Sequence, residues 1–332
     1  MNIPLVSVIV IGRNEGKRLA ECLKSINETN DFDGDLELIY VDSDSKDGSP
    51  ELAESLGAKV LCVKPQRPSA ALGRNTGWRA SSGLYVLFLD GDTLLHPDFI
   101  GAALKAINSP DIAVVWGHRR ETYPEKSLYN RVLDLDWIYS AGVSDFCGGD
   151  ALMCRDVLEQ VGGFSEDLIA GEEPELCQRI RAQGKIILHI DHPMTRHDLA
   201  MNQFKSYWKR AVRAGHAYAE VSQRMKLTAF PLWVNECHRN VVHVSVLLML
   251  LFAASFLSFF SRDLFPFVGL LLSYTFLILR SAYKARWKST SLVTLLLYGL
   301  HSHFQQIPIA CGQVSYWYHR FRNLQQDLIE YK

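Results

Sequence analysis

The chain has 332 residues and a formal net charge of −1, so no overall basic bias favours a nucleic-acid partner. Its length suits one large α/β domain with an appendage, or two modest domains. The seven cysteines are scattered and odd in number, and none forms a C-x-x-C pair, which argues against a disulfide framework or a structural zinc site. Scattered thiols are typical of a reducing compartment.

The first half of the chain alternates short apolar runs with helical patterns. Repeated β-α units predict an α/β fold with a mostly parallel, Rossmann-like sheet and helices on both faces. Ligands of such sheets bind at the carboxyl ends of the strands, so the polar residues after each apolar run form the candidate site. The expected strands are 5–11, 36–41, 59–63, 84–89 and 112–116, and the expected helices are 15–26, 50–56, 70–80 and 96–107.

The N-terminus predicts a buried strand and not a signal peptide. It lacks a basic start, and Arg13, Asn14 and Glu15 interrupt its apolar stretch early. With no export signal in this sequence, we expect the N-terminal domain to stay in the cytoplasm.

Asp90, Gly91 and Asp92 directly follow the apolar run 84–89. Two carboxylates at the end of a buried strand are costly unless a positive group meets them. Mg²⁺ in proteins often pairs one or two carboxylates with substrate phosphates, and such a cation neutralises a diphosphate leaving group. The alternative is a turn in which each Asp caps backbone N–H groups. The strand before these residues and the segment 96–98 after them favour the metal site.

Polar residues after the second strand and on the third helix suggest nucleotide contacts. Asp42 and Asp44 are placed to accept hydrogen bonds from a base or a ribose, and an Asx turn is the alternative. Arg74 is a candidate for neutralising phosphate, although a lone arginine on a helix is more often a surface charge.

Two further segments supply candidate groups for the chemistry. Glu172 and Glu173 precede an expected helix at 176–183, and Pro174 in its first turn predicts that both glutamates lie just outside it. One of them is a candidate general base for an acceptor hydroxyl, although acidic residues also suit a helix N-terminus for dipole reasons alone. The glycines of the segment 148–150 permit close backbone approach. After an expected strand at 185–190, one of His192, His197 and Asp198 is a candidate to complete a metal shell or touch phosphate, although a lone histidine is more often structural.

The character of the sequence changes from about Phe204. The segment 204–224 mixes aromatic and basic residues at helical spacing, which predicts a helix in the membrane interface; a solvated helix packed on the domain is the alternative. Runs 241–260 and 264–279 are apolar enough for a transmembrane hairpin. The basic cluster at 280–288 then favours the cytoplasmic side.

A third apolar segment, 292–318, is interrupted by polar residues. It fits either a third crossing or a re-entrant or interfacial helix, and the positive-inside tendency favours the second. We therefore expect a catalytic domain at 1–200, an interfacial region at 201–235 and membrane-anchoring helices at 236–332.

Taken in order, these motifs resemble the family-2 glycosyltransferases, which have the GT-A fold. The likeness covers residues 4–198. Gly171–Glu173 lies where the family usually has Glu-Asp, with the second residue as catalytic base. The other matching elements are the first strand and Asn-Glu turn at 8–15, the nucleotide-binding turn at 41–49, the Ala-Arg-Asn-x-Gly element at 73–77, the Asp-x-Asp segment at 88–93 and the acceptor-side loop and helix at 148–164.

The resemblance implies an inverting transfer from a nucleotide-diphosphate sugar with Mg²⁺ or Mn²⁺ as cofactor. We expect a UDP-sugar rather than a GDP-sugar, although Ser43 stands where many relatives carry a second Asp that reads the base. The expected site residues are Glu173 and Glu172 for catalysis; Gly12, Arg13, Asn14, Glu15, Asp42, Asp44, Arg74, Asp90 and Gly91 for the nucleotide sugar; Asp90, Asp92 and His197 for the metal; and Gly148, Gly149 and Asp150 on the acceptor side.

The leading hypothesis is a membrane-anchored hexosyltransferase that moves a single sugar to a lipid-linked or membrane-proximal glycan acceptor. This places it in cell-envelope or exopolysaccharide biosynthesis, at the inner or plasma membrane. The alternatives are a polyprenyl-phosphate sugar synthase and a catalytically inactive membrane scaffold. A nucleotidyltransferase is disfavoured by the acidic first turn, and a dinucleotide oxidoreductase by the lack of G-x-G-x-x-G there.

Overall fold

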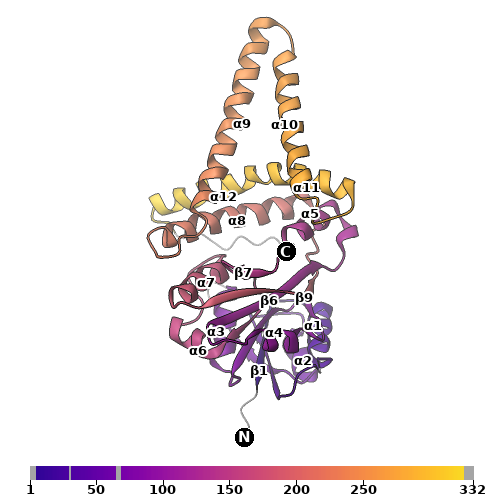
Figure 1. Ribbon diagram of the computed structural model, residues 1–332, viewed down its shortest axis with the longest axis vertical. Helices are drawn as coiled ribbons and strands as arrows, with labels where there is room; N and C mark the ends of the chain where they lie inside the picture. The colour runs from indigo at the N-terminus through magenta and orange to yellow at the C-terminus, as the bar shows by residue number, and fades with distance from the viewer. Residues whose placement is uncertain (1–4, 30, 65–68, 325–332) are drawn as a thin grey trace. The chain divides into compact units, whose positions relative to one another are not determined.

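The computed structural model describes residues 5–29, 31–64 and 69–324 (Figure 1). Residues 1–4, at the start of the expected catalytic domain, and 325–332, at the end of the expected membrane region, lie outside this description. The chain divides into two compact units. Unit 1 comprises 1–122, 137–199 and 227–232, and unit 2 comprises 123–136, 200–226 and 233–332.

Unit 1 contains one large mixed sheet with the strand order β3-β2-β1-β4-β8-β6-β9-β5, and β7 pairs with β9. The expected α/β class with flanking helices is confirmed. The strands are β1 (Val6–Gly12), β2 (Leu36–Asp42), β3 (Lys59–Cys62), β4 (Tyr85–Asp90), β5 (Thr93–Leu95), β6 (Ile112–Glu121), β7 (Gly142–Ser144), β8 (Ala151–Cys154) and β9 (Ile186–His197).

The part of the sheet built by strands β1 to β4 is parallel. Strand β1 pairs in parallel with β2 and β4, so that Gly12 lies opposite Asp42 and Ile11 opposite Asp90. The carboxyl ends of these strands therefore meet at one edge, as the β-α alternation predicts. The rest of the sheet is mixed, because β8 enters antiparallel to both β4 and β6.

The helices of unit 1 cover this sheet and enclose its core. Strands β1 and β4 are almost wholly buried, and residues such as Ile9 and Phe88 are fully inaccessible. Burying one such side chain contributes roughly 1.5–3 kcal/mol. Gly77 allows the third helix to approach the sheet closely, since a Cβ there would lie 2.2 Å from Ile9 Cγ2. These helices are α1 (Lys17–Asn27), α2 (Ser49–Ser55), α3 (Ala70–Arg79), α4 (Phe99–Ala106), α6 (Arg155–Val161) and α7 (Glu172–Ala182).

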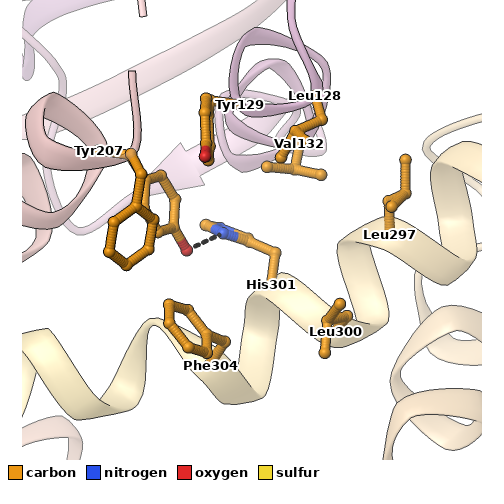
Figure 2. A pocket seen from close by; sticks show the side chains of 9 residues that line it. Leu128, Tyr129, Val132, Tyr207, Leu297, Leu300, His301 and Phe304 are labelled. Atoms are coloured by element: carbon orange, nitrogen blue, oxygen red, sulfur yellow. Dashed lines mark hydrogen bonds between the residues drawn. The ribbon is translucent and has the colours of Figure 1, made fainter. Parts of the chain in front are cut away.

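Unit 2 is helical. Its α5, α8 and α11 enclose an apolar cavity (Figure 2). The expected helix at 204–224 is present as α8. The elements are the short 3₁₀ helix η1 (Pro124–Lys126) and the α-helices α5 (Leu128–Asp136), α8 (Phe204–Met225), α9 (Val234–Ser261), α10 (Phe265–Lys284), α11 (Leu292–Phe304) and α12 (Gln306–Phe321).

Among the described residues, α9 and α10 are long and apolar enough to cross a bilayer, with mean hydropathies of 2.3 and 1.5. Their large apolar side chains are exposed; Phe252 and Phe259, for example, are 73% and 77% accessible. The third apolar segment forms two helices joined at Gln305, α11 with 13 residues and α12 with 16. Each is shorter than the ~20 residues that a perpendicular crossing requires.

Helices α8 and α12 approach each other through glycine. A Cβ at Gly215 would lie 2.0 Å from the Ile309 carbonyl oxygen, and one at Gly312 would lie 2.0 Å from that of Val212. Any larger side chain would push the two backbones apart, so these glycines set the distance between the helices.

Candidate active site

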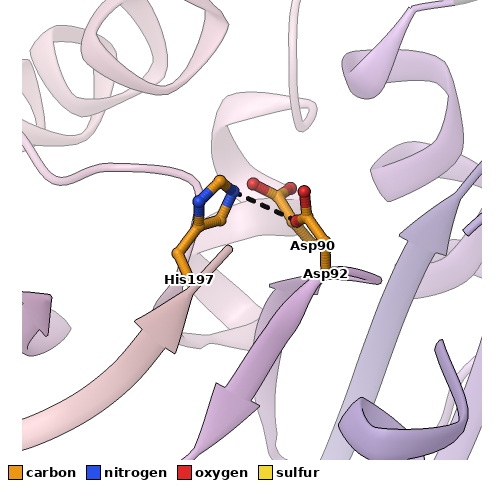
Figure 3. A group of neighbouring side chains, drawn as sticks. All are labelled: Asp90, Asp92 and His197. Carbon is orange, nitrogen blue, oxygen red and sulfur yellow. Dashed lines mark ion pairs between the residues drawn. The ribbon is translucent and has the colours of Figure 1, made fainter. Parts of the chain in front are cut away.

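Asp90, Asp92 and His197 converge at the edge of the sheet in unit 1 (Figure 3). Asp90 ends β4, Asp92 lies in the following turn, and His197 is the last residue of β9. The antiparallel pairing of β5 with β9 places Thr93 opposite His197, which brings the imidazole to the Asp-x-Asp turn. One ligand atom from each of the three residues lies within 4.8 Å of the others, and His197 Nε2 is 3.1 Å from Asp92 Oδ1.

The donor set of this cluster fits a divalent cation. It offers two carboxylates and one imidazole, and Asp92 and His197 are each only 4% exposed. Carboxylates suit Mg²⁺ and Mn²⁺, and imidazole is a good ligand for transition ions. The prediction that β9 ends at residue 190 was wrong. The strand continues to His197, because its pairing with β5 and with the extended β6 supplies backbone partners beyond the apolar run.

The other candidates near this histidine do not join the cluster. The His192 ring packs edge-on against His96 at 5.7 Å between ring centroids. Asp198 donates its backbone N–H to the Asp92 carbonyl oxygen at 3.2 Å. Both residues therefore contribute to the packing of this edge. Of the three candidates, His197 belongs to the described cluster, and its ring points to the two carboxylates (Figure 3).

Arg74 lies at the centre of a group of carboxylates. Its Nη1 atom is 2.9 Å from Glu172 and 2.8 Å from Glu173, and its Nη2 atom is 3.0 Å from Asp90. The side chain is almost fully buried, so the alternative of a surface charge is wrong. Burial by itself lowers the pKa of Arg74, but the carboxylates of Glu173, Asp90 and Glu172 outweigh it and raise that pKa. A buried guanidinium persists because several carboxylates compensate for its lost hydration.

Glu172 and Glu173 form the first turn of α7. The prediction that they lie outside the helix was wrong: Gly171, in the left-handed region at φ 86°, caps the helix, and Pro174 occupies its first turn without loss because no N–H is needed there. Burial and the charge of Glu172 raise the pKa of Glu173 from its usual 4.5 to about 7, despite the opposing effect of Arg74. A carboxylate with this pKa exchanges protons near neutral pH, which suits a general base.

Gly149 lies directly against these charged groups. A Cβ there would lie 2.6 Å from Arg74 Nη2, 3.2 Å from Glu173 Oε1 and 3.3 Å from Asp90 Oδ2. Its neighbour Asp150 is fully buried, accepting a hydrogen bond from Thr195 at 2.7 Å and one from the Asp90 backbone N–H at 3.3 Å. Asp150 thus links β4 to β9 and fixes the turn that carries Gly149. A Cβ at Gly148, the preceding residue, would lie 4.0 Å from Arg119 Nη1.

The turns after β1 and β2 are tied to each other. The backbone N–H of Asn14 donates to Ser45 Oγ at 2.8 Å, and the N–H of Lys46 donates to Asn14 Oδ1 at 2.8 Å. Asp42 is buried and accepts hydrogen bonds from Tyr40 Oη at 2.9 Å and from the Ser45 N–H at 2.8 Å. The Asx-type turn considered for Asp42 is therefore present.

The remaining residues expected to bind nucleotide lie around these turns. Asp44 is at φ 63° and pairs with Lys46 at 2.7 Å. Arg13 is exposed, and Glu15 pairs with Arg18 at 2.7 Å. Gly91 donates its N–H to the Ile11 carbonyl oxygen at 2.8 Å, which joins the Asp-x-Asp turn to the end of β1.

Two residues of the site were missed by the sequence analysis, Arg119 and Trp137. Arg119 lies 3.5 Å from Asp90 Oδ2 and 3.6 Å from Asp150 Oδ2, and its guanidinium stands 4.8 Å above the Trp137 ring. That ring packs edge-on against His197 at 5.2 Å. Arg119 follows the apolar run 112–116, so the rule that located Asp90 also points to it once β6 is extended.

Comparison with known proteins agrees with this geometry. The model of the glycosyl transferase family 2 matches residues 7–162, which contain Arg74, the Asp-x-Asp turn and Gly149. Residues 7–162 therefore form a family-2 glycosyltransferase domain. It is 27% identical over 191 residues to the glycosyltransferase AglE of Haloferax volcanii, covering 55% of this chain and 63% of that protein. It is 27% identical over 125 residues to the putative glycosyltransferase EpsH of Bacillus subtilis, covering 36% of each.

The match thus spans less than two thirds of either relative's length. Among solved structures, the mannosyltransferase PcManGT from Pyrobaculum calidifontis, in complex with GDP-Man and Mn²⁺, superposes with a TM-score of 0.70 at 19% identity. The superposition covers 96% of this chain and 89% of PcManGT, which confirms the GT-A-type fold.

Proposed function

We propose that this chain is a membrane-anchored, inverting glycosyltransferase that moves one sugar from a nucleoside-diphosphate sugar to a lipid-linked or membrane-proximal acceptor. The observation that carries the proposal is the convergence of a metal-type cluster, a buried arginine and a glutamate of raised pKa around Gly149. These are the groups that transfer of a glycosyl unit from a diphosphate requires: charge neutralisation at the leaving group and a base for the nucleophile.

In this mechanism Glu173 accepts the proton of the acceptor hydroxyl. The freed oxygen attacks the anomeric carbon from the face opposite the diphosphate, the bond from that carbon to the diphosphate oxygen breaks, and the configuration inverts. Arg74, which already pairs with Glu173 and Asp90, is placed to stabilise the negative charge that passes to the leaving group. Gly149 allows the backbone to lie directly against these charged groups, because a Cβ there would clash with Arg74.

Asp90, Asp92 and His197 would hold the divalent cation, Mg²⁺ or Mn²⁺. When bound, such an ion supplies charge neutralisation to the departing diphosphate. Asp90 has a second task, because its carboxylate also meets Arg74 and Arg119. Loading of the cation is thereby linked to the positions of both arginines.

The membrane part of the proposal rests on α9 and α10. A hairpin of two helices with these hydropathies, followed by the basic residues 280–288, fits an anchor in the inner or plasma membrane with the catalytic unit in the cytoplasm. An enzyme held at a bilayer has direct access to acceptors carried on lipids. Cell-envelope or exopolysaccharide synthesis supplies acceptors of this class.

Isothermal titration of the detergent-solubilised protein tests the donor site. UDP and GDP are each titrated with and without Mn²⁺ into the wild type, Asp92→Ala and the control Asp98→Ala, whose carboxylate lies outside the cluster. We expect Mn²⁺-dependent binding of one nucleotide in the wild type and the control, and its loss in Asp92→Ala. Absence of binding of either nucleotide to folded wild-type protein would overturn the transferase proposal in favour of an inactive scaffold.

The same titration decides the base of the donor. The expectation from the sequence is a UDP-sugar, whereas PcManGT was solved with GDP-Man. In this chain the turn that would face the base offers Asp42 and Asp44 with Ser43 between them. Tighter binding of GDP than of UDP would replace the UDP expectation and leave the rest of the proposal intact.

A further inference from the structure

An apolar cavity of about 220 Å³ lies within unit 2 (Figure 2). Helices α5, α8 and α11 provide its walls, and its lining is aliphatic and aromatic apart from one imidazole. The lining residues are Leu128, Tyr129, Val132, Phe204, Tyr207, Leu297, Leu300, His301 and Phe304.

Most polar atoms of the lining already form hydrogen bonds with other groups of the protein. His301 Nδ1 is 2.9 Å from Tyr207 Oη, and His301 Nε2 is 3.0 Å from Asp136 Oδ2. Tyr298 donates to the other oxygen of Asp136 at 3.0 Å. Both ring nitrogens of His301 therefore have partners, and no charged side chain lines the cavity. The ligand that fits such a surface is a hydrocarbon and not a phosphate or a sugar.

The same polar chain explains why the cavity stays open. Asp136 ends α5, His301 lies on α11 and Tyr207 on α8, so the contacts Asp136–His301–Tyr207 link the three walls. The Tyr129 and Tyr207 rings stack at 5.1 Å and stiffen the contact of α5 with α8. Contacts that hold the walls in this way make the cavity a preformed apolar site, which is the kind of site that binds apolar ligands.

The mouth of the cavity favours a lipid as the occupant. Leu128, Phe204 and Leu300 line it and are each about half exposed, at 53%, 51% and 48%. Helix α11 also packs closely on the candidate membrane helix α10, since a Cβ at Gly299 would lie 2.4 Å from the Ile278 carbonyl oxygen. One wall of the cavity is thus continuous with the surface that is apolar enough to enter a bilayer.

We infer that this cavity binds the hydrocarbon chain of the lipid-linked acceptor. The inference rests on the proposed function, since it assumes that the acceptor sugar is carried on a lipid. The apolar lining takes only the chain of such an amphiphile, and its polar head must stay outside. The chain then supplies binding energy remote from the reacting atoms, so shortening or removing it should raise KM more than it lowers kcat.

The test uses a photoreactive polyprenyl phosphate in nanodiscs of phosphatidylcholine, with the full chain embedded. Leu300→Trp fills the mouth of the cavity, Leu128→Trp fills it from α5, and Val293→Trp adds the same bulk on an exposed part of α11 outside the lining. We expect labelling of α5, α8 or α11 in the wild type, about tenfold less in both mouth variants, and no change in the control.

Three outcomes would overturn the inference. These are labelling confined to α9 and α10, equal labelling of α5, α8 and α11 by a phosphatidylcholine with a photoreactive acyl chain, or equal labelling in the mouth variants and the control. The first two would assign the contact to bulk bilayer lipid. The titration of nucleotide with Mn²⁺ is run on the same samples without the probe. If the wild type does not bind nucleotide, the proposed function is wrong. If it binds nucleotide but the labelling result is one of the three above, only the inference about the lipid cavity is wrong.

Discussion

The buried polar side chains of the two units are arranged differently. In unit 1, Arg74 and Arg119 face Asp90, Glu172, Glu173 and Asp150, so acidic groups outnumber the basic ones at one point of the sheet edge. In unit 2, Asp136, His301 and Tyr207 form a linear chain in which each contact links two helices. Burial and the neighbouring charge of Glu172 raise the pKa of Glu173 in unit 1 to about 7. Strongly shifted pKa values of this kind cluster at functional sites.

This difference indicates which kind of buried charged group belongs to a catalytic site. A chain of matched partners stabilises the packing of helices and needs no ligand. A cluster of like charges around a glycine is stable only because other groups, or a bound cation, offset the repulsion. The contrast predicts large functional effects and small structural ones for changes at the unit 1 cluster, and the reverse for changes at the helix contacts of unit 2.

The largest expected effect is that of Glu173→Gln. The amide keeps the size of the side chain but cannot accept the proton, so we expect kcat to fall by about 10² to 10⁴ with a hydroxyl acceptor. Initial rates with saturating donor and Mn²⁺ measure it, and nucleotide affinity should be retained. Glu175→Gln, in the same turn of α7 but paired with Arg179 at 2.8 Å, is the matched control and should keep its activity.

A mild effect of Glu173→Gln has a definite meaning as well. A phosphate acceptor is already ionised and needs little help from a base, so near wild-type rates would favour the polyprenyl-phosphate sugar synthase. If activity survived with a hydroxyl acceptor, the assignment of Glu173 as base would be wrong.

The pH dependence of the reaction is the next largest effect. The base must be ionised to act, so kcat/KM should rise about tenfold per pH unit up to the pKa of Glu173, about 7, and then level off. The effect on folding has the opposite sign. Because the pKa of Glu173 is raised from 4.5 to about 7 in the folded state, its contribution to stability is full below 4.5 and is lost as the pH rises through 7.

The rate profile is measured between about pH 5 and 9, a range that brackets the raised pKa of Glu173. Nucleotide affinity with Mn²⁺, determined at each pH, separates loss of the base from loss of the cation. A flat profile across this range at constant nucleotide affinity would contradict a base that titrates near neutral pH.

The smallest effect on activity is expected from Gly312→Ala, which tests unit 2. The added methyl group would lie 2.0 Å from the Val212 carbonyl oxygen and force α8 and α12 apart. We expect a loss of about 1–3 kcal/mol in stability, seen as a lower melting temperature, with nucleotide binding unchanged. Gly269→Ala on α10 is the control, since nothing lies within 4 Å of a Cβ there. Loss of nucleotide binding in Gly312→Ala would contradict the expectation that changes at the helix contacts of unit 2 affect stability and not function.

Much of unit 1 was predictable because its signals are local. Apolar runs of β-branched residues located the strands, and the ends of two of these runs located Asp42 and Asp90. The predictions failed where a contact distant in sequence extends an element. Strand β9 continues to His197 because β5 and β6 pair with it, and α7 begins at Glu172 because Gly171 adopts a left-handed conformation.

Sequence by itself determined the α/β class, the strand-end motifs and the two long apolar helices, since each follows from the pattern of neighbouring residues. Tertiary structure alone decided that Arg74 is the buried partner of three carboxylates, that Arg119 and Trp137 stand beside His197, and that α5, α8 and α11 enclose a cavity. These facts depend on residues tens to more than a hundred positions apart. Their proximity is set by strand order and helix packing, which no local pattern encodes.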